Sequence, residues 1–247
     1  MSSVPPSPRT TPSPRRCCPA WKSRWAASST TAAVRPGMSR FAGGRPMTTA
    51  KPKLRTGTRM SAAEYLALPE IDEYRWLELD DGELYFMPRP RRIHLFVSSR
   101  LTNFFENHLE SFDEPPAEVY SELVIIISQE SGRILIPDLS IFLRAPGDES
   151  DISASGRILD IVIEILSTDR NRDLVRKRQL YAEASVHEYW IFDPVNDNVL
   201  PLELRGGKYA ERPTLTADDT LTTPLLPGLE IPLGSIFNHR RRPPRDE

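Results

Sequence analysis

The sequence predicts an α/β (α+β) fold in which a mixed β-sheet is flanked by helices and followed by a C-terminal antiparallel meander. Two apolar runs of strand length, residues 136–143 and 157–167, lie close together in the chain, and each carries a carboxylate. Stretches with a helical apolar period, residues 91–112 and 169–184, stand before and after these runs. Because strand and helix patterns alternate along the chain, we expect the helices to cover the faces of a sheet.

The remaining elements are predicted from local signals. Ser61 and Glu64 have the spacing of a capping box, which predicts a short helix that ends at Pro69. Asp81-Gly82 separates two alternating runs and predicts a β-hairpin. Further strands are expected at residues 121–128 and 186–193, a loop at 146–156, and turns at 196–198, 206–207 and 227–228.

Glu164 lies within a run of Ile, Val and Leu that is typical of a central strand buried on both faces. Burying even an uncharged polar group without a partner costs about 2–7 kcal/mol, so Glu164 is expected to have a partner, a metal or a catalytic task. Strand alternation places Glu164 on one face with Asp160, Val162 and Leu166. If the strand that follows Asp138 lies beside it, the two carboxylates can converge on one hard cation.

The charge of the chain is unevenly distributed. Twelve Lys and Arg residues and no acidic residue precede Glu64, which leaves 20 basic against 34 acidic residues in the remainder. An acidic body argues against a broad, non-specific DNA-binding surface. No apolar run approaches the roughly 18–20 residues of a membrane helix, so no membrane partner is expected.

We divide the chain into a basic, disordered extension at residues 1–58, one domain at residues 59–238 and a loose tail at residues 239–247. The extension also has the composition of an organelle transit peptide, and a basic arm for nucleic acid is a further interpretation. The interpretation that we prefer is an assigned start that is too early, with Met38 or Met47 as the first residue. Cys17 and Cys18 are adjacent and lack zinc-ligand spacing, and a domain without cysteine suggests a cytoplasmic location.

Lys177 lies between Leu174 and Tyr181 on the side of the predicted helix that should face the sheet, with Asp173 one turn earlier. The same helix carries the one basic patch on the acidic body. Its ordinary interpretation is a solvated face, although it lies beside the predicted site, where a phosphate backbone would pass. The patch consists of Arg170, Arg172, Arg176, Lys177 and Arg178.

Several segments together resemble the Uma2 family, once called DUF820, over roughly residues 61–237. They are residues 79–83, His94, Pro137-Asp138, residues 162–167, residues 173–181, residues 186–194 and residues 222–233. The resemblance implies the restriction-endonuclease-like fold of the PD-(D/E)XK nuclease superfamily and cleavage of phosphodiester bonds in DNA with Mg²⁺ or Mn²⁺. Since dimers are common among related nucleases, a homodimer is compatible with it.

The resemblance also implies roles for individual residues. Asp138 and Glu164 would be metal ligands, and Glu83 would complete the acidic cluster directly or through water. The superfamily usually places a Lys two residues after the strand acid, where this chain has Leu166, and Lys177 of the next helix would replace it. Such a lysine would lie near the phosphate and would orient or deprotonate the attacking water. His94 and Asp173 would be auxiliary residues.

Each of these residues also has an ordinary structural interpretation. Glu164 and Lys177 can form a buried ion pair without catalysis, Asp138 can be a strand-entry residue and Glu83 an exposed strand residue. His94 can be a satisfied histidine at a helix start, and Asp173 can merely orient Lys177. The alternative function is therefore a catalytically inactive nuclease fold that binds or regulates.

Overall fold

The computed structural model describes residues 54–69, 74–144 and 159–238. All of them belong to one compact unit, residues 51–247, and the preceding unit, residues 1–50, is not described. The predictions for the N-terminal extension up to residue 53, for the 146–156 loop and for the tail therefore lie outside the described residues. Among the described residues, no helix combines the length and the apolar character that crossing a membrane requires.

The main sheet has the strand order β10-β9-β8-β7-β6-β3, and the short β11 also pairs with β9. Only the β7–β8 pair is parallel, and the neighbouring pairs are antiparallel, so the predicted mixed sheet is confirmed. The strands are β3 (Ala117–Ser121), β6 (Leu139–Leu143), β7 (Ile161–Ile165), β8 (Glu188–Asp193), β9 (Asn198–Arg205), β10 (Lys208–Glu211) and β11 (Leu215–Thr216).

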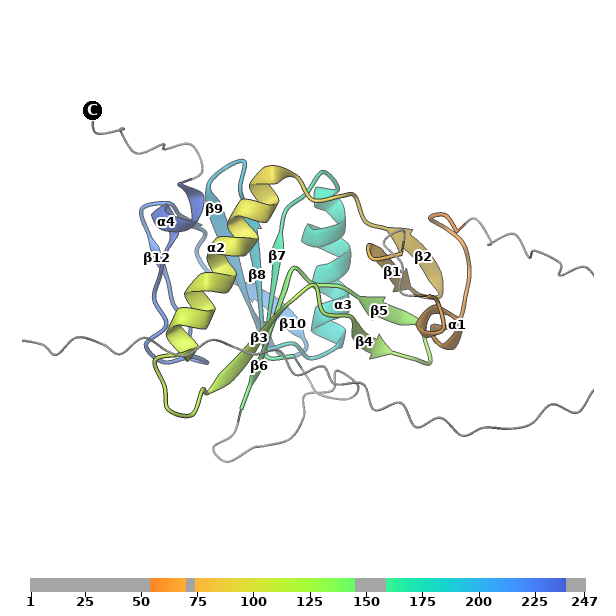
Figure 1. The fold of residues 1–247 in the computed structure, drawn as a ribbon, viewed down its shortest axis with the longest axis horizontal. Coiled ribbons are helices and arrows are strands. Elements are labelled where there is room, and N and C mark those ends of the chain that lie inside the picture. The colour runs from red at the N-terminus through yellow and green to blue at the C-terminus, as the bar shows by residue number, and fades with distance from the viewer. Residues whose placement is uncertain (1–53, 70–73, 145–158, 239–247) are drawn as a thin grey trace, which may run out of the picture. The chain divides into compact units, whose positions relative to one another are not determined.

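The parallel pair requires a crossover connection, and the predicted helix at residues 169–184 supplies it. The structure divides this helix into a π-helical segment, η1 (Arg172–Lys177), and an α-helix, α3 (Arg178–Glu183). Its buried Leu180 and Tyr181 pack on the sheet face that carries Val162 and Tyr189. Figure 1 shows α3 beside the central strands, with α2 in front of the sheet.

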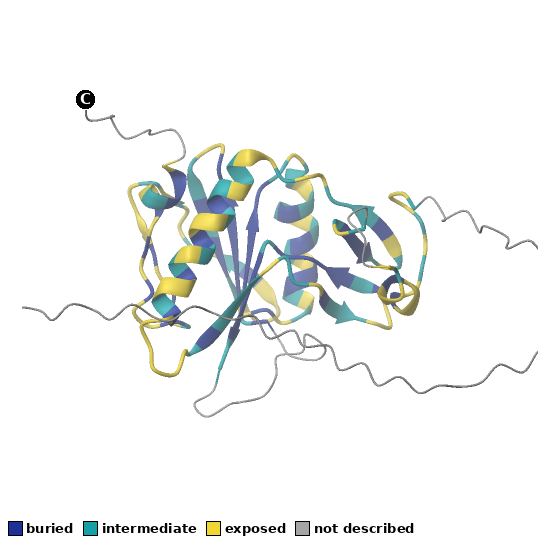
Figure 2. Ribbon diagram, in the orientation of Figure 1, coloured by how far each residue is buried: buried dark blue, intermediate teal, exposed yellow. Residues whose placement is uncertain are grey.

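Helix α2 (Arg92–Leu109) covers the opposite face of the sheet. Its buried Val97, Leu101 and Phe105 belong to the same apolar cluster as Ile163 and Trp190. Central strands β7 and β8 are buried along their whole length, while the helices expose one side, as Figure 2 shows. The short helices are α1 (Ala62–Leu66), which begins with the predicted capping box, and α4 (Leu233–Phe237).

A second sheet has the order β2-β1-β5-β4 and contains the predicted hairpin. Asp81 and Gly82 both have positive φ values, 50° and 77°, as a two-residue hairpin turn of type I′ requires. This turn contacts Gly132 of the neighbouring turn, because Gly82 N–H donates to the Gly132 carbonyl at 3.0 Å. The strands are β1 (Leu77–Asp80), β2 (Glu83–Phe86), β4 (Ile125–Ser128) and β5 (Arg133–Leu135); β12 (Thr220–Leu221) and β13 (Ile231–Pro232) form a separate pair.

Candidate active site

The register of β6 and β7 brings the two predicted carboxylates together. Leu139 lies opposite Ile163 in this antiparallel pair, so Asp138 is the cross-strand neighbour of Glu164 and shares its face of the sheet. The Ile165 N–H donates to Asp138 Oδ2 at 2.6 Å, which fixes this carboxylate at the entry to β6. The expectation that the two strands lie side by side is thus confirmed.

Lys177 reaches the same place from the crossover helix. Its Nζ lies 2.8 Å from Glu164 Oε1 and 3.0 Å from Glu78 Oε1, and only 2% of the side chain is exposed. Asp173 Oδ1, one turn earlier, lies 3.9 Å from Nζ. Asp173 and Lys177 belong to the π-helical segment η1, and π-helical turns often occur at functional sites. The Tyr181 hydroxyl also donates to Glu164 Oε1, at 2.7 Å.

Glu78 is a member of the cluster that the sequence analysis missed. It is completely buried in β1, accepts from the Ile136 N–H and forms a 2.7 Å ion pair with Arg172 in addition to its contact with Lys177. The available signal was the alternation of β1, in which Glu78 and Asp80 share one face between buried leucines. In the structure η1 covers this charged face, because its Arg172 and Lys177 pair with Glu78.

The structure does not bring Glu83 into the cluster. Its side chain is 48% exposed and pairs with Arg59 at 2.7 Å, next to the hairpin turn. In the β1–β2 register Glu83 lies opposite Asp80, whereas Glu78 lies opposite Tyr85, further from the turn and nearer to Lys177. Glu78, rather than Glu83, is therefore the glutamate of the β1–β2 hairpin that contacts Lys177.

His94 lies in the first turn of α2 and contacts Asp138, with 3.0 Å between His94 Nε2 and Asp138 Oδ2. Burial opposes the charged imidazole, but the hydrogen bond and the negative charge of Asp138 raise the pKa of His94 above its ordinary value. His94 Nδ1 is buried and has no hydrogen-bond partner in the part of the chain that the structure describes. His94 therefore helps to hold Asp138 in place.

Burial and mutual repulsion dominate the electrostatics of the cluster. Burial raises the pKa of Glu164 well above its usual range; Lys177 opposes this, and Asp138 adds to it. Burial likewise raises the pKa of Asp173 to about 6, against the attraction of Lys177. The surrounding carboxylates raise the pKa of Lys177 despite its burial, so Lys177 stays an ammonium.

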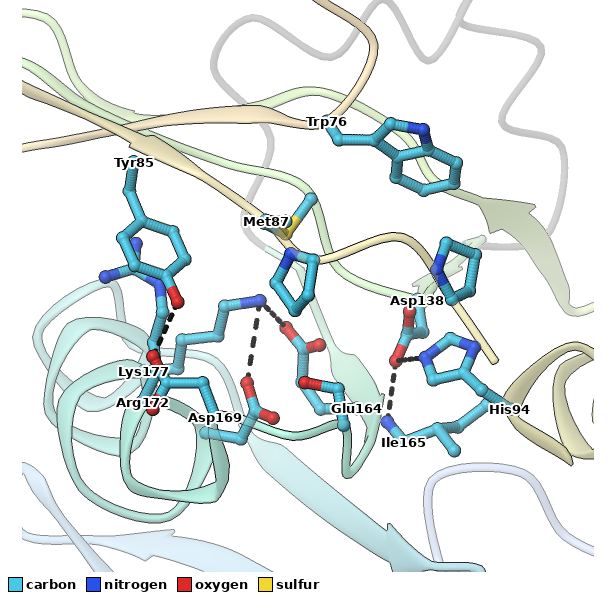
Figure 3. A pocket seen from close by; sticks show the side chains of 14 residues that line it. Trp76, Tyr85, Met87, His94, Asp138, Glu164, Ile165, Asp169, Arg172 and Lys177 are labelled. Carbon is cyan, nitrogen blue, oxygen red and sulfur yellow. Dashed lines mark hydrogen bonds and ion pairs between the residues drawn. The ribbon is translucent and has the colours of Figure 1, made fainter. Parts of the chain in front are cut away.

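The charged groups of the cluster other than Glu78 line a small pocket of about 50 Å³, together with Asp169 (Figure 3). Its other wall is largely apolar and carries Trp76 and Met87, with Pro88 and Pro90 beside them. In Figure 3 Asp138 lies between Glu164 and His94, and Lys177 reaches Glu164 from the other side. The volume accommodates a few water molecules or a partly hydrated ion.

The basic patch of the crossover helix is largely neutralised. Arg170 pairs with Asp193, and Arg178 pairs with Glu211. Arg172 and Arg176 bind carboxylates of the β1–β2 hairpin, and Arg172 also stacks on Tyr85, with its guanidinium carbon 3.8 Å from the ring centroid. These arginines fix the helix to the two sheets, and the expected path for a phosphate backbone finds no support along them.

The donor set fits a hard divalent ion that keeps several water ligands. Within the described ranges, no group of three His, Cys, Asp or Glu residues is arranged as a complete metal site. However, Asp138 Oδ1 and Glu164 Oε2 have no hydrogen-bond partner among the described residues, while the other oxygen of each carboxylate accepts two hydrogen bonds or contacts. Mg²⁺ is commonly held by one or two carboxylates together with water and substrate phosphate.

The fold is a mixed α+β fold in which two carboxylates from adjacent strands and a lysine from the crossover helix meet at one pocket. Residues 62–234 match the Uma2 family, which is described as "Putative restriction endonuclease", so the chain belongs to the Uma2 family. This membership supports a nuclease function acting on nucleic acid.

One similar solved structure is a crystal structure of a "putative nuclease belonging to DUF820" from Anabaena variabilis ATCC 29413. It shares 22% sequence identity with this chain, with a TM-score of 0.58, and the match covers 72% of this chain and 98% of that one. At this identity the likeness shows the fold, and the predicted fold class is confirmed. No curated protein matches the chain.

Proposed function

We propose that the chain is an endonuclease that hydrolyses phosphodiester bonds in DNA with Mg²⁺ or Mn²⁺. The observation that carries the proposal is the convergence of Asp138, Glu164 and Lys177, from three elements, on one pocket. Four carboxylates line this pocket, those of Asp138, Glu164, Asp169 and Asp173, against two permanent cations, Lys177 and Arg172. A divalent ion would balance the excess of two negative charges that results if all four carboxylates are ionised.

The proposed roles follow from the two carboxylate oxygens that have no hydrogen-bond partner among the described residues. Asp138 Oδ1 and Glu164 Oε2 would hold the ion, which supplies positive charge to the phosphate and lowers the pKa of a bound water. His94 and the Ile165 N–H keep the Asp138 carboxylate oriented. Because its pKa is raised, Lys177 would act as a fixed positive charge that stabilises the charged transition state, rather than as the base that removes a proton from water.

The alternative is a nuclease fold that binds or regulates without cutting. It is favoured by the complete pairing of Lys177 with Glu164 and Glu78 and by the neutralised arginines of the crossover helix. A structural role, however, explains neither the free oxygens of Asp138 and Glu164 nor the excess of carboxylates. We therefore rank the endonuclease first.

Cleavage assays on the full chain separate the two functions. Supercoiled plasmid, single-stranded DNA and an RNA oligonucleotide are incubated with Mg²⁺, Mn²⁺ or chelator, beside Asp138→Asn and Glu83→Gln. We expect metal-dependent cleavage of DNA that Asp138→Asn abolishes and Glu83→Gln preserves, because Glu83 pairs with Arg59 outside the pocket. Absence of cleavage with either metal would favour the binding module, and equal cleavage by Asp138→Asn would assign the activity to a contaminant.

The homodimer, the cytoplasmic location and the domain limits stay predictions. Light scattering during size-exclusion chromatography would test the dimer. Limited proteolysis would test the domain limits, with residues 59–238 as the expected protected core. Gly57 and Thr58, which precede this core, are hydrogen-bonded to Leu84 of the β1–β2 hairpin: Gly57 N–H donates to the Leu84 carbonyl, and Leu84 N–H donates to the Thr58 carbonyl.

A further inference from the structure

The segment that connects β2 to α2 is a basic strip at the rim of the pocket. It reads Met87-Pro-Arg-Pro-Arg-Arg92, and its Met87, Pro88 and Pro90 line the pocket wall. Arg89, Arg91 and Arg92, which we call the rim arginines, are all exposed. The strip continues directly into the helix that carries His94, so it lies beside the carboxylate that His94 contacts.

The rim arginines differ from the other arginines around the pocket because they have no partner. None of the three guanidinium groups makes a hydrogen bond, ion pair or ring contact within the described ranges, whereas Arg170, Arg172, Arg176 and Arg178 all bind carboxylates. The rim arginines are thus available to bind a ligand, whereas the arginines of the crossover helix are already paired with carboxylates.

Their position in the chain is electrostatically unfavourable. The N-terminus of a helix carries a partial positive charge and favours acidic residues nearby. Here the 18-residue α2 has no acidic residue in its first turn and no side-chain cap, and Arg91 and Arg92 occupy its first positions. A cluster of three unpaired cations at a positive helix end is relieved by an anion, and phosphate is an anion that such positions bind.

Backbone geometry keeps the strip in place before a ligand arrives. Pro88 and Pro90 restrict the backbone on both sides of Arg89, and Met87 N–H donates to the Trp76 carbonyl at 2.8 Å. Trp76 also lines the pocket. The rim is therefore a preorganised surface whose charges face solvent next to the proposed site of cleavage.

We propose that the rim arginines bind the phosphate backbone of the nucleic acid next to the phosphate that is cut. This rests on the proposed function, since the bound strand is the substrate of the same pocket. The phosphate backbone of the nucleic acid would therefore run along the rim arginines rather than along the crossover helix. Because three cations bind only a short stretch of backbone, positioning of the strand, rather than tight binding of duplex DNA, is their expected effect.

The test measures binding without cleavage. Anisotropy of a fluorescein-labelled single-stranded DNA oligonucleotide is recorded in chelator over a salt series, with the full chain and with two double variants. Arg89→Gln/Arg91→Gln removes two rim charges, and Arg205→Gln/Lys208→Gln removes two exposed charges at the β9–β10 hairpin. The basic residues that precede Glu64 are present in all three proteins and contribute equally to binding.

We expect the rim variant to lower the salt slope, the dependence of log K on log salt, by about 1.4, since each lost phosphate contact to a single strand contributes about 0.7. The control variant should leave the slope unchanged. Equal slopes for the two variants, or no binding by the parent chain, would overturn the inference.

Cleavage is scored separately, so the two proposals can fail independently. If the rim variant has a reduced salt slope but the parent chain cleaves no DNA, the endonuclease proposal is refuted and the binding surface is supported. A rim variant that binds and cuts like the parent, in a protein that does cut, would refute the binding surface alone. An added Arg92→Gln change should reduce the slope further, by about another 0.7.

Discussion

Asp173 offers a direct test of the electrostatics of the pocket. It is a buried carboxylate whose pKa is raised to about 6 from 3.8, because burial and the neighbouring carboxylates outweigh the attraction of Lys177. Raising a pKa from 3.8 to about 6 corresponds to about 3 kcal/mol of free energy against the ionised form. Ionised Asp173 therefore makes the folded protein less stable than a neutral side chain of the same shape would.

The sign of the pH dependence follows from the direction of the shift. Since the pKa is higher in the folded than in the unfolded protein, the folded protein binds this proton more tightly. The penalty is absent below about pH 4, grows as the pH rises and is complete above about pH 6. Asp173→Asn should raise the free energy of unfolding by up to about 3 kcal/mol at pH 8, and by almost nothing at pH 4.

Urea unfolding in chelator at several pH values would measure this difference. For a domain of this size, 3 kcal/mol corresponds to a rise of about 6–12 °C in the melting temperature, which differential scanning calorimetry can confirm. An Asp173→Asn variant that is no more stable than the parent at pH 8 would refute the reasoning, and so would a stability gain that does not change with pH.

Asp193→Asn is the matched control with the opposite sign. Despite burial, hydrogen bonds from Arg170 and Asn196 lower the pKa of Asp193. Its ionised form therefore stabilises the folded protein above the unfolded-state pKa, and this contribution is lost as the pH falls. The control should thus be less stable than the parent at pH 8, with a difference that shrinks in acid.

Three further substitutions test the packing of the site. Lys177→Met leaves buried glutamates without their ammonium and should lower stability by about 3–5 kcal/mol in urea unfolding, far more than a methionine at the exposed Lys208. Tyr181→Phe removes a donor to Glu164 and should cost about 1–3 kcal/mol in the same assay; no change would mean that water replaces the hydroxyl. Gly132→Ala, at φ 63° with a Cβ 3.0 Å from a backbone nitrogen, should lower the melting temperature, and an unchanged value would contradict the turn geometry.

The sequence alone predicted the part of the site that depends on the main sheet. An apolar run interrupted by a glutamate indicates a buried strand, and alternation then determines which residues share its face. The helical period likewise directed Lys177 towards the sheet, where it contacts Glu164. These predictions succeeded because each rests on geometry within one element and on a neighbour close in the chain.

The parts that the sequence could not predict depend on contacts between distant elements. η1 covers one end of the β1–β2 hairpin, and this contact decides whether Glu78 or Glu83 joins the cluster. The hairpin and η1 are almost 100 residues apart in the chain. The pairing of Arg176 with Asp80 has the same origin. A run of arginines on a helix looks alike in sequence whether it faces phosphate or carboxylates, so the folded arrangement alone distinguishes these cases.

The composition of the cluster argues against a purely structural role. A structural ion pair would be complete with Lys177 and one glutamate, yet Lys177 has three carboxylates within 3.9 Å, and Asp138 raises the pKa of both Glu164 and Asp173. Asp173 makes the folded protein less stable at neutral pH, by the argument above. Buried groups whose charge opposes folding are concentrated at functional sites, where a ligand or a reaction requires them. Asp138 and Glu164 contribute carboxylate oxygens to a space of ion and water size, which is consistent with the hard cation that we propose as the ligand.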